Sequence, residues 1–216
     1  MKVLSKTVGA FQENAYLVID EATNEAVFID PGDEPDALIE LVRKSGANLR
    51  AIWLTHAHLD HVGGIAGLCR VWKVPVHLHS ADLPVLERAP VSAAMYGIAF
   101  EAPETPDVFV EDGQRLSIGE LSFDVVHTPG HAPGHVVFRN GTTVFGGDLL
   151  FAGSIGRTDL PYADPAAMED SLEKISRWDD ATVVHPGHGP STTIGHEKAS
   201  NPFLTGIAKP VKRVIA

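Results

Sequence analysis

The sequence has few of the features that define several common classes of protein. One cysteine among 216 residues excludes a scaffold of intramolecular disulfides. Lys and Arg number 17 against 28 Asp and Glu, and the resulting net charge of −11 argues against binding to nucleic acid or to an anionic membrane. No apolar run approaches the roughly 18 residues of a membrane span, and no signal-peptide pattern opens the chain. These absences favour a cytoplasmic protein without a membrane or nucleic-acid partner.

The sequence does contain enough apolar residues for a sizeable core, together with many histidines. Hydrophobic residues make up 44% and charged residues 21%, which is typical of a globular protein and excludes disorder of the whole chain. No low-complexity linker divides the chain, so we expect a single domain over residues 1–216. The 11 histidines matter because imidazole is the commonest metal ligand in proteins.

Short apolar runs that end at glycine, proline or polar residues predict strands in both halves of the chain. Helices are expected over 35–45, 63–70, 81–88 and 166–178, and the first would have Asp33 as its N-cap and Gly46 just after its end. Residues 90–106 contain several prolines and little periodicity, so we expect a loop that is a candidate lid. Two strand-rich halves, each followed by a helix, favour an α/β fold of two packed sheets with outer helices.

Four potential metal ligands follow the apolar strand predicted over residues 50–55. His56, His58, Asp60 and His61 fall within six residues of one another. Side chains two apart on an extended chain point to the same side, so His56 and His58 can reach one metal position while the next two residues reach a neighbouring one. A surface turn is the alternative explanation, but four ligands in six residues make it the weaker one.

Three more potential ligands each lie beside glycines just beyond a predicted strand: His131, Asp148 and His188. Any one of them alone is typical of an ordinary Gly/Pro turn. Together with residues 56–61 they make seven candidates on four strand ends, which matches two divalent ions that share one carboxylate. Because sulfur is nearly absent, the donor set indicates an open hydrolytic site rather than a closed structural zinc site.

These residues carry a resemblance to a known family. The string His-Ala-His-Leu-Asp-His over residues 56–61, followed in order by His131, Asp148 and His188, resembles the metallo-β-lactamase superfamily over nearly the whole chain. The strings over 147–151, 154–159 and 186–190 are similar to the glyoxalase II branch, in its short bacterial form. The resemblance implies an αββα four-layer sandwich with a two-metal site at its edge.

The resemblance also implies a role for each site residue. His56, His58 and His131 would hold the first metal, Asp60, His61 and His188 the second, and Asp148 would bridge them. Asp30 would support the site by hydrogen bonding to a ligand. The ions would be Zn²⁺ in the first instance, with Fe or Mn also compatible.

The implied activity is hydrolysis of a glutathione thioester, S-D-lactoylglutathione, to D-lactate and glutathione. Two divalent ions would activate a shared water for attack on the carbonyl carbon, and Asp60 would accept or orient its proton. Arg157 is a candidate for binding a glutathione carboxylate, although it could instead pair with Asp159 or Asp164. The tyrosine and the C-terminal extension that hold glutathione in longer glyoxalase II enzymes have no counterpart here.

Other activities remain open on the same scaffold. A persulfide dioxygenase would use a single non-haem iron held by His56, His131 and Asp148, but the Pro-Gly-His-Gly-Pro string over 186–190 favours the hydrolase. A lactonase is compatible with the same ligands. A zinc β-lactamase of the kind that uses a cysteine ligand is disfavoured, because Asp148 occupies that position. A metal-binding module without activity is the non-enzymatic alternative.

Overall fold

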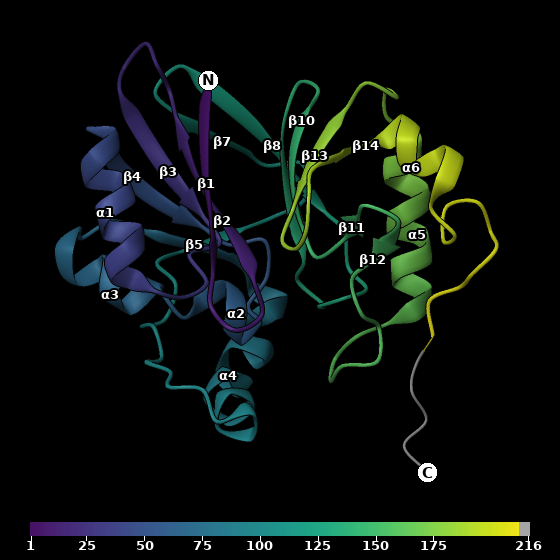
Figure 1. Ribbon diagram of the computed structural model, residues 1–216, viewed down its shortest axis with the longest axis horizontal. Helices are drawn as coiled ribbons and strands as arrows, with labels where there is room; N and C mark the ends of the chain where they lie inside the picture. The colour runs from purple at the N-terminus through teal and green to yellow at the C-terminus, as the bar shows by residue number, and fades with distance from the viewer. Residues whose placement is uncertain (212–216) are drawn as a thin grey trace.

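The computed structural model describes residues 1–211, in which two six-stranded β-sheets pack face to face (Figure 1). The first sheet contains β1 (Lys2–Val8), β2 (Glu13–Ile19), β3 (Glu25–Ile29), β4 (Asn48–Trp53), β5 (Val76–His79) and β6 (Val108–Val110), in that order. The second has the order β14-β13-β10-β9-β8-β7 and contains β7 (Arg115–Ile118), β8 (Leu121–His127), β9 (Val136–Asn140), β10 (Thr143–Gly147), β13 (Val183–Pro186) and β14 (Thr192–Thr193). A small separate hairpin joins β11 (Leu150–Phe151) to β12 (Ser154–Ile155).

The direction of the strands brings several strand ends to one edge of the molecule. The pairs β3–β4, β4–β5 and β5–β6 are parallel, and in the second sheet β10 and β13 are parallel. The carboxyl ends of parallel strands meet at the same edge of a sheet, which is where a scaffold can present side chains from several loops to one site. The segments that follow β4, β10 and β13 all carry residues that the sequence marks as candidate ligands.

Helices cover the outer face of each sheet, as Figure 1 shows for α1 and α3 on one side and α5 and α6 on the other. The helices are α1 (Pro35–Ser45), α2 (Leu59–Val62), α3 (Ile65–Val71), α4 (Leu83–Tyr96), α5 (Pro165–Ser176) and α6 (Ile194–Ser200), with a 3₁₀ turn η1 (Ser80–Asp82). None of the helices within residues 1–211 is long and apolar enough to cross a membrane.

Three buried clusters fill the spaces between these layers. One lies between the two sheets and includes Trp53 of β4, which contacts the rings of Phe123 and Phe138 at centroid distances of 5.3 Å. The other two lie between each sheet and its helices. The four-layer αββα sandwich expected from the sequence is therefore confirmed.

The start of α1 differs from the expectation in one detail. The helix has the predicted bounds, and Gly46 follows it in the left-handed conformation with φ 71°. The N-cap residue, however, is Glu34, which has φ 48° and makes no side-chain cap hydrogen bond. Asp33 lies one residue before this N-cap, and its Oδ1 accepts a hydrogen bond from the backbone N–H of Glu34, at 2.7 Å.

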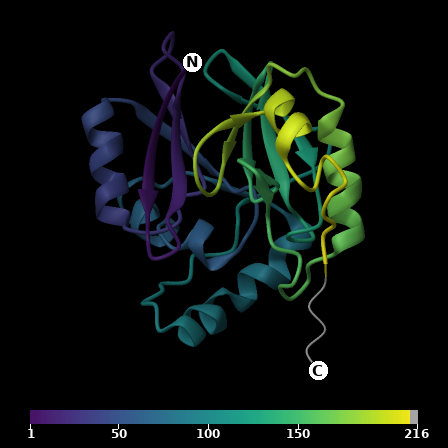
Figure 2. The same cartoon turned by 45° about the vertical axis from the view of Figure 1, so that its right-hand side comes forward.

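The expected short helix over 81–88 is longer in the structure, and the first part of the loop expected over 90–106 is helical. Helix α4 continues through Pro90 to Tyr96, and it runs along the lower edge of the sandwich in Figure 2. Pro90 is exposed, while Val85, Ala89 and Ala93 repeat every four residues and are buried. Burial of that stripe offsets the hydrogen bond that proline removes from the helix. Within the loop expected over 90–106, only residues 97–106 are irregular.

Candidate metal centre

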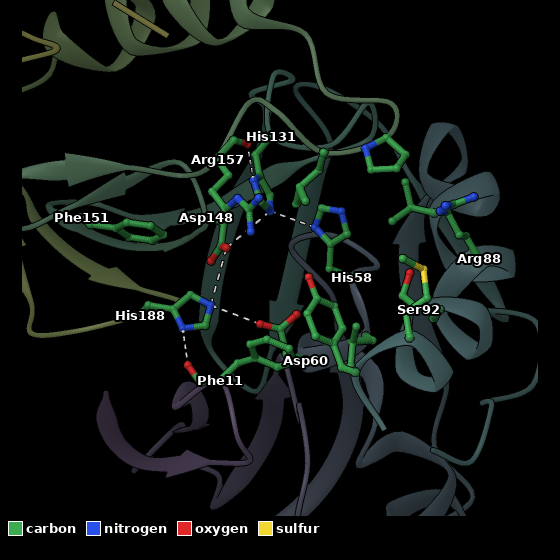
Figure 3. Close-up of a pocket in the computed structure, with 17 residues that line it drawn as sticks. Phe11, His58, Asp60, Arg88, Ser92, His131, Asp148, Phe151, Arg157 and His188 are labelled. Atoms are coloured by element: carbon green, nitrogen blue, oxygen red, sulfur yellow. Dashed lines mark hydrogen bonds and ion pairs between the residues drawn. The ribbon is translucent and has the colours of Figure 1, made fainter. Parts of the chain in front are cut away.

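The seven candidate ligands lie together at the edge where the strand ends meet, and five of them are visible in Figure 3. His56 and His58 follow β4, Asp60 and His61 lie in α2, His131 follows β8, Asp148 follows β10 and His188 follows β13. Both sheets therefore contribute to one site. The strand-end placement expected from the sequence is what brings these distant segments together.

The first group contains His56, His58 and His131, whose ligand atoms lie within 4.8 Å of one another. The Nδ1 atom of His58 is 2.8 Å from Nε2 of His131. On its other side, the Nδ1 of His131 is 2.8 Å from the backbone carbonyl of Arg157. A carbonyl can only accept, so Nδ1 of His131 carries the proton and Nε2 presents its lone pair to the group.

The second group contains Asp60, His61 and His188, again with ligand atoms within 4.8 Å. Nε2 of His188 is 3.3 Å from Oδ2 of Asp60, while its Nδ1 donates to the backbone carbonyl of Phe11 at 3.1 Å. Nδ1 of His61 is 3.1 Å from Oδ2 of Asp30. In both rings, an acceptor outside the group therefore holds one nitrogen and leaves Nε2 for the site.

Asp148 lies between the two groups. Its Oδ2 is 3.4 Å from Nε2 of His131 in the first group and 3.6 Å from Nε2 of His188 in the second. Its Oδ1 is 3.4 Å from Nε2 of His61. This position is compatible with the bridging role that the family pattern implies.

Asp30 is fixed at the end of β3 and supports His61 from outside the site. Its Oδ1 accepts from the backbone N–H of Thr55 at 2.7 Å, and its Oδ2 accepts from the Thr55 hydroxyl at 2.6 Å. A grouping of Asp30 with His56 and His61 is also close enough to hold an ion. Both carboxylate oxygens of Asp30 already accept hydrogen bonds, which favours its supporting role.

The remaining histidines near the ligands face elsewhere. His135 is fully buried, but its Nε2 accepts from the backbone N–H of Asp148 at 3.0 Å and its Nδ1 lies 2.9 Å from the hydroxyl of Thr128. Both of its nitrogens are therefore occupied by protein groups. His127 and His185 likewise make hydrogen bonds outside the two groups.

Most ligand candidates have pKa values that favour the protonation state needed to bind a cation. Burial lowers the pKa of His58 to about 3 and that of His56 well below its ordinary value. Burial opposes ionisation of Asp60 and Asp148, but neighbouring histidines hold the pKa of each carboxyl below its usual range. For His61, Asp148 outweighs the effect of burial and raises the pKa, so a proton and a cation compete for this ring.

The donor set fits divalent metal ions. Three buried atoms in the centre, Nε2 of His56, Nε2 of His61 and Oδ1 of Asp148, have no hydrogen-bond partner within residues 1–211. Buried polar atoms are normally paired, and a metal ion is one of the partners that satisfies them. Imidazole and carboxylate donors suit Zn, Fe or Mn. The two groups are consistent with a two-metal site.

Sequence reasoning missed residues of β2 that hold the last ligand loop. Asn14 donates from Nδ2 to the carbonyls of Pro186 and Gly189, at 3.2 and 2.8 Å. The hydroxyl of Tyr16 donates to the Pro186 carbonyl at 2.7 Å. These bonds fix the segment that carries His188. The Pro186 carbonyl lies 172 residues from Asn14 and 170 from Tyr16 in the sequence, so no local signal pointed to these bonds.

Asp82, at the end of η1, was also missed. It is fully buried, and its two carboxylate oxygens accept backbone N–H bonds from Gly134 at 2.6 Å and Ala57 at 2.8 Å. Ala57 lies between His56 and His58, so Asp82 ties that ligand loop to the loop that follows β8 and to the start of α4. Burial raises the pKa of Asp82 to about 6.

Two glycines permit the close approach of backbone around the ligands. A Cβ atom on Gly32 would lie 1.8 Å from the carbonyl oxygen of Asp60. One on Gly187 would lie 2.3 Å from Oδ1 of Asp148 and 2.8 Å from Cε1 of His61. At these two positions the absence of a side chain is therefore required by space.

A cavity of about 430 Å³ opens over the centre (Figure 3). Apart from the ligands, it is lined mainly by apolar side chains of α4 and of the loops around it: Phe11, Leu59, Val85, Ala89, Met95, Tyr96, Phe151, Leu160 and Pro161. Arg157 also lines the cavity, but its guanidinium pairs with Asp159, with N–O distances of 2.8 and 3.1 Å. The pairing with Asp159 that the sequence left open is therefore present.

Comparison with known proteins agrees with this geometry. The metallo-β-lactamase superfamily pattern matches residues 8–194. The chain is 39% identical to hydroxyacylglutathione hydrolase GloC of Haemophilus influenzae, over 91% of this chain and 95% of that protein. Among solved structures, it is similar to TTHA1623 in a di-iron-bound form, with 50% identity, TM-score 0.88, and coverage of 94% of this chain and 100% of that one. It is also similar to the BLEG-1 B3 metallo-β-lactamase, with 38% identity, TM-score 0.88, and coverage of 95% and 100%.

The chain belongs to the metallo-β-lactamase superfamily. Its fold and its paired His/Asp groups are those of a metal-dependent hydrolase of that superfamily. The resemblance drawn from the motifs is thereby confirmed at the level of the family.

Proposed function

We propose that this protein hydrolyses thioesters of a small thiol, with S-D-lactoylglutathione as the representative substrate. The observation that carries the proposal is the placement of Asp148 between two groups of three ligands, which provides for two adjacent divalent ions. The similarity to hydroxyacylglutathione hydrolase GloC supports the thioester class. His56, His58 and His131 would hold one ion, and Asp60, His61 and His188 the other, with Asp148 shared.

When bound, two such ions lower the pKa of a shared water to near 7 and polarise a carbonyl group. The protein's own groups prepare the site for that chemistry. Phe11 and Arg157 supply the backbone carbonyls that orient His188 and His131. Asp60 is held ionised, with Oδ2 toward His188, and its other oxygen can accept the proton of the attacking water. Apolar side chains around the cavity can contact the apolar parts of a thioester.

The test combines metal analysis with a hydrolysis assay on one freshly purified sample. We expect about two metal ions per chain and loss of the thioester absorbance of S-D-lactoylglutathione. His188→Ala should lower the metal content toward one ion and reduce turnover at least about a hundredfold, since truncation removes a ligand. His196→Ala, at an exposed position of α6, is the matched control and should leave both values unchanged. A fully loaded protein that leaves the thioester intact would refute the proposal.

The metal analysis also separates the persulfide dioxygenase alternative. That reaction needs one iron, for which His56, His131 and Asp148 would be the ligands. A single iron per chain, together with oxygen uptake on glutathione persulfide and no thioester hydrolysis, would replace the hydrolase proposal. The presence of the complete second group, Asp60, His61 and His188, favours the hydrolase.

Cleavage of a β-lactam is a second candidate activity, favoured by the similarity to a B3 metallo-β-lactamase. The open apolar cavity gives a bicyclic amide access to the same ligands. A chromogenic cephalosporin assayed on the same sample tests this activity, and a lactone tests the remaining alternative. Hydrolysis of the cephalosporin with a kcat/KM above that for the thioester would reverse the order of the two candidates.

A further inference from the structure

One face of α4 forms a wall of the cavity. Six of its residues line that space: Val85, Arg88, Ala89, Ser92, Met95 and Tyr96. Their spacing of three and four residues is that of a single helix face. Tyr96 also packs edge-on against Phe11, with ring centroids 5.1 Å apart, and the carbonyl of Phe11 orients His188. The helix is therefore joined to the metal centre through this contact and through Asp82.

Arg88 is the unpaired cation on this face. Its guanidinium makes no ion pair or hydrogen bond with any other residue of the described part of the chain, 1–211. The residues one turn away on the helix are Pro84 and Ser92, neither of which is acidic. By contrast, Arg157, the other arginine that lines the cavity, is engaged by Asp159.

The position of Arg88 distinguishes it from an ordinary solvated arginine. In Figure 3, Arg88 and Ser92 lie on the helix wall, across the cavity from Asp148 and His188. The other residues of α4 on that wall are uncharged, so no other side chain on this face of the helix offers a charged contact to a ligand. On a chain of net charge −11, an unpaired guanidinium at the cavity wall is a local point of attraction for an anion.

We propose that Arg88, assisted by the hydroxyl of Ser92 one turn along, binds a carboxylate on the thiol half of the substrate. A guanidinium matches a carboxylate with two parallel N–H···O bonds, and a serine hydroxyl adds a third donor. The site then selects thioesters whose leaving thiol carries a carboxylate remote from sulfur. This specificity rests on the proposed function, because it assumes that the thioester carbonyl sits at the metal centre.

Binding of a non-hydrolysable ligand tests Arg88 without relying on turnover. The probes are S-methylglutathione and its dimethyl ester, titrated by calorimetry into the metal-loaded protein. We expect Arg88→Gln to weaken binding of S-methylglutathione about tenfold, as the loss of a charge-assisted contact at an exposed position implies. Arg88→Lys should retain part of the affinity. Binding of the dimethyl ester should be weaker in the wild type and unaffected by either substitution.

Arg177→Gln is the matched control. It removes the same charge from an exposed arginine of the segment after α5, which pairs with Glu173 and does not line the cavity. Binding of S-methylglutathione should remain within twofold of the wild type in this variant. Equal losses in Arg88→Gln and Arg177→Gln would show that only net charge matters and would overturn the proposal. So would a wild type that binds the dimethyl ester as well as the free acid.

Kinetic assays distinguish a failure of the proposed role of Arg88 from a failure of the proposed hydrolase function. With S-D-lactoylglutathione, Arg88→Gln should raise KM about tenfold and leave kcat within twofold, while Ser92→Ala should raise KM two- to threefold. With the neutral lactoyl thioester of N-acetylcysteamine, neither substitution should matter. If the wild type hydrolyses both thioesters and Arg88→Gln changes neither KM, the role of Arg88 is refuted and the hydrolase stands. If no thioester is hydrolysed, the proposed function fails and the calorimetry alone decides on Arg88.

Discussion

Replacement of Asp82 by asparagine should change how the free energy of unfolding depends on pH. Loss of this carboxyl should favour the folded state progressively more as the pH rises. The two oxygens of Asp82 accept the N–H groups of Gly134 and Ala57 in a fully buried position. Near pH 4 the folded-state carboxyl is protonated, so Asp82 and an asparagine are both uncharged and similar in shape. An asparagine nitrogen cannot accept the second of these N–H bonds, however, so we expect the Asp82→Asn variant to be less stable than the wild type there by about 1–3 kcal/mol.

The stability of the variant relative to the wild type should rise with pH. Burial raises the pKa of Asp82 from 3.8 to about 6 in the folded state, despite the two N–H bonds. A carboxyl with a raised folded pKa contributes stability that is present below the unfolded pKa and lost as pH rises through the folded value. That loss amounts to about 2.4 kcal/mol between pH 4 and pH 7. An asparagine does not titrate, so the variant avoids it.

Urea unfolding followed by tryptophan fluorescence, to which the buried Trp53 contributes, measures both proteins across this pH range. A chelator in every sample removes metal binding from the comparison. The control is Asp170→Asn, on the exposed surface of α5, which makes the same chemical change and should show no pH-dependent difference from the wild type. If the stability of the variant relative to the wild type did not rise between pH 4 and pH 7, the N–H bonds would outweigh burial, and the reasoning would be refuted.

Other perturbations of the site have equally direct outcomes. Asn14→Ala removes two bonds to residues 186–189 and should lower the unfolding free energy by about 1–3 kcal/mol and the metal content after dialysis, measured by elemental analysis. Gly32→Ala places a methyl group 1.8 Å from the carbonyl of Asp60, so we expect loss of metal and a Tm several degrees lower in a thermal melt. Chelator treatment should lower Tm, and added Zn²⁺ should restore it. Acidification should release metal, since protons compete at His61; constant metal content down to pH 4 would contradict this.

The candidate ligands were predictable because each carries a local signal. His56, His58, Asp60 and His61 follow an apolar strand in one run, and the later ligands each lie next to glycine at a strand end. Their number, their position after strands and the family resemblance together predicted one site, and the structure brings their ligand atoms together. Their assignment to two metal positions stays a prediction that the geometry supports, as does the single-domain organisation.

The parts that could not be predicted depend on partners distant in sequence. Proline normally ends a helix, and only the burial of Val85, Ala89 and Ala93 shows why α4 continues past Pro90. The bond from Tyr16 to the Pro186 carbonyl spans 170 residues, and no local pattern announces it. Short elements such as β6, β14 and α6 were not predicted for the same reason, since tertiary pairing rather than propensity defines them.

The bonds from β2 to the 186–189 segment have a consequence for synthesis on the ribosome. Asn14 and Tyr16 are made roughly 10–30 s before Pro186, given 170 intervening residues and ordinary elongation rates. During that interval β2 can pair with β1 and β3, but the face that will meet the second sheet has no partner. Nascent chains therefore pass through a stage with exposed apolar surface and an incomplete site. A chain cut short before β13 would remain at that stage, as a substrate for chaperones and proteases.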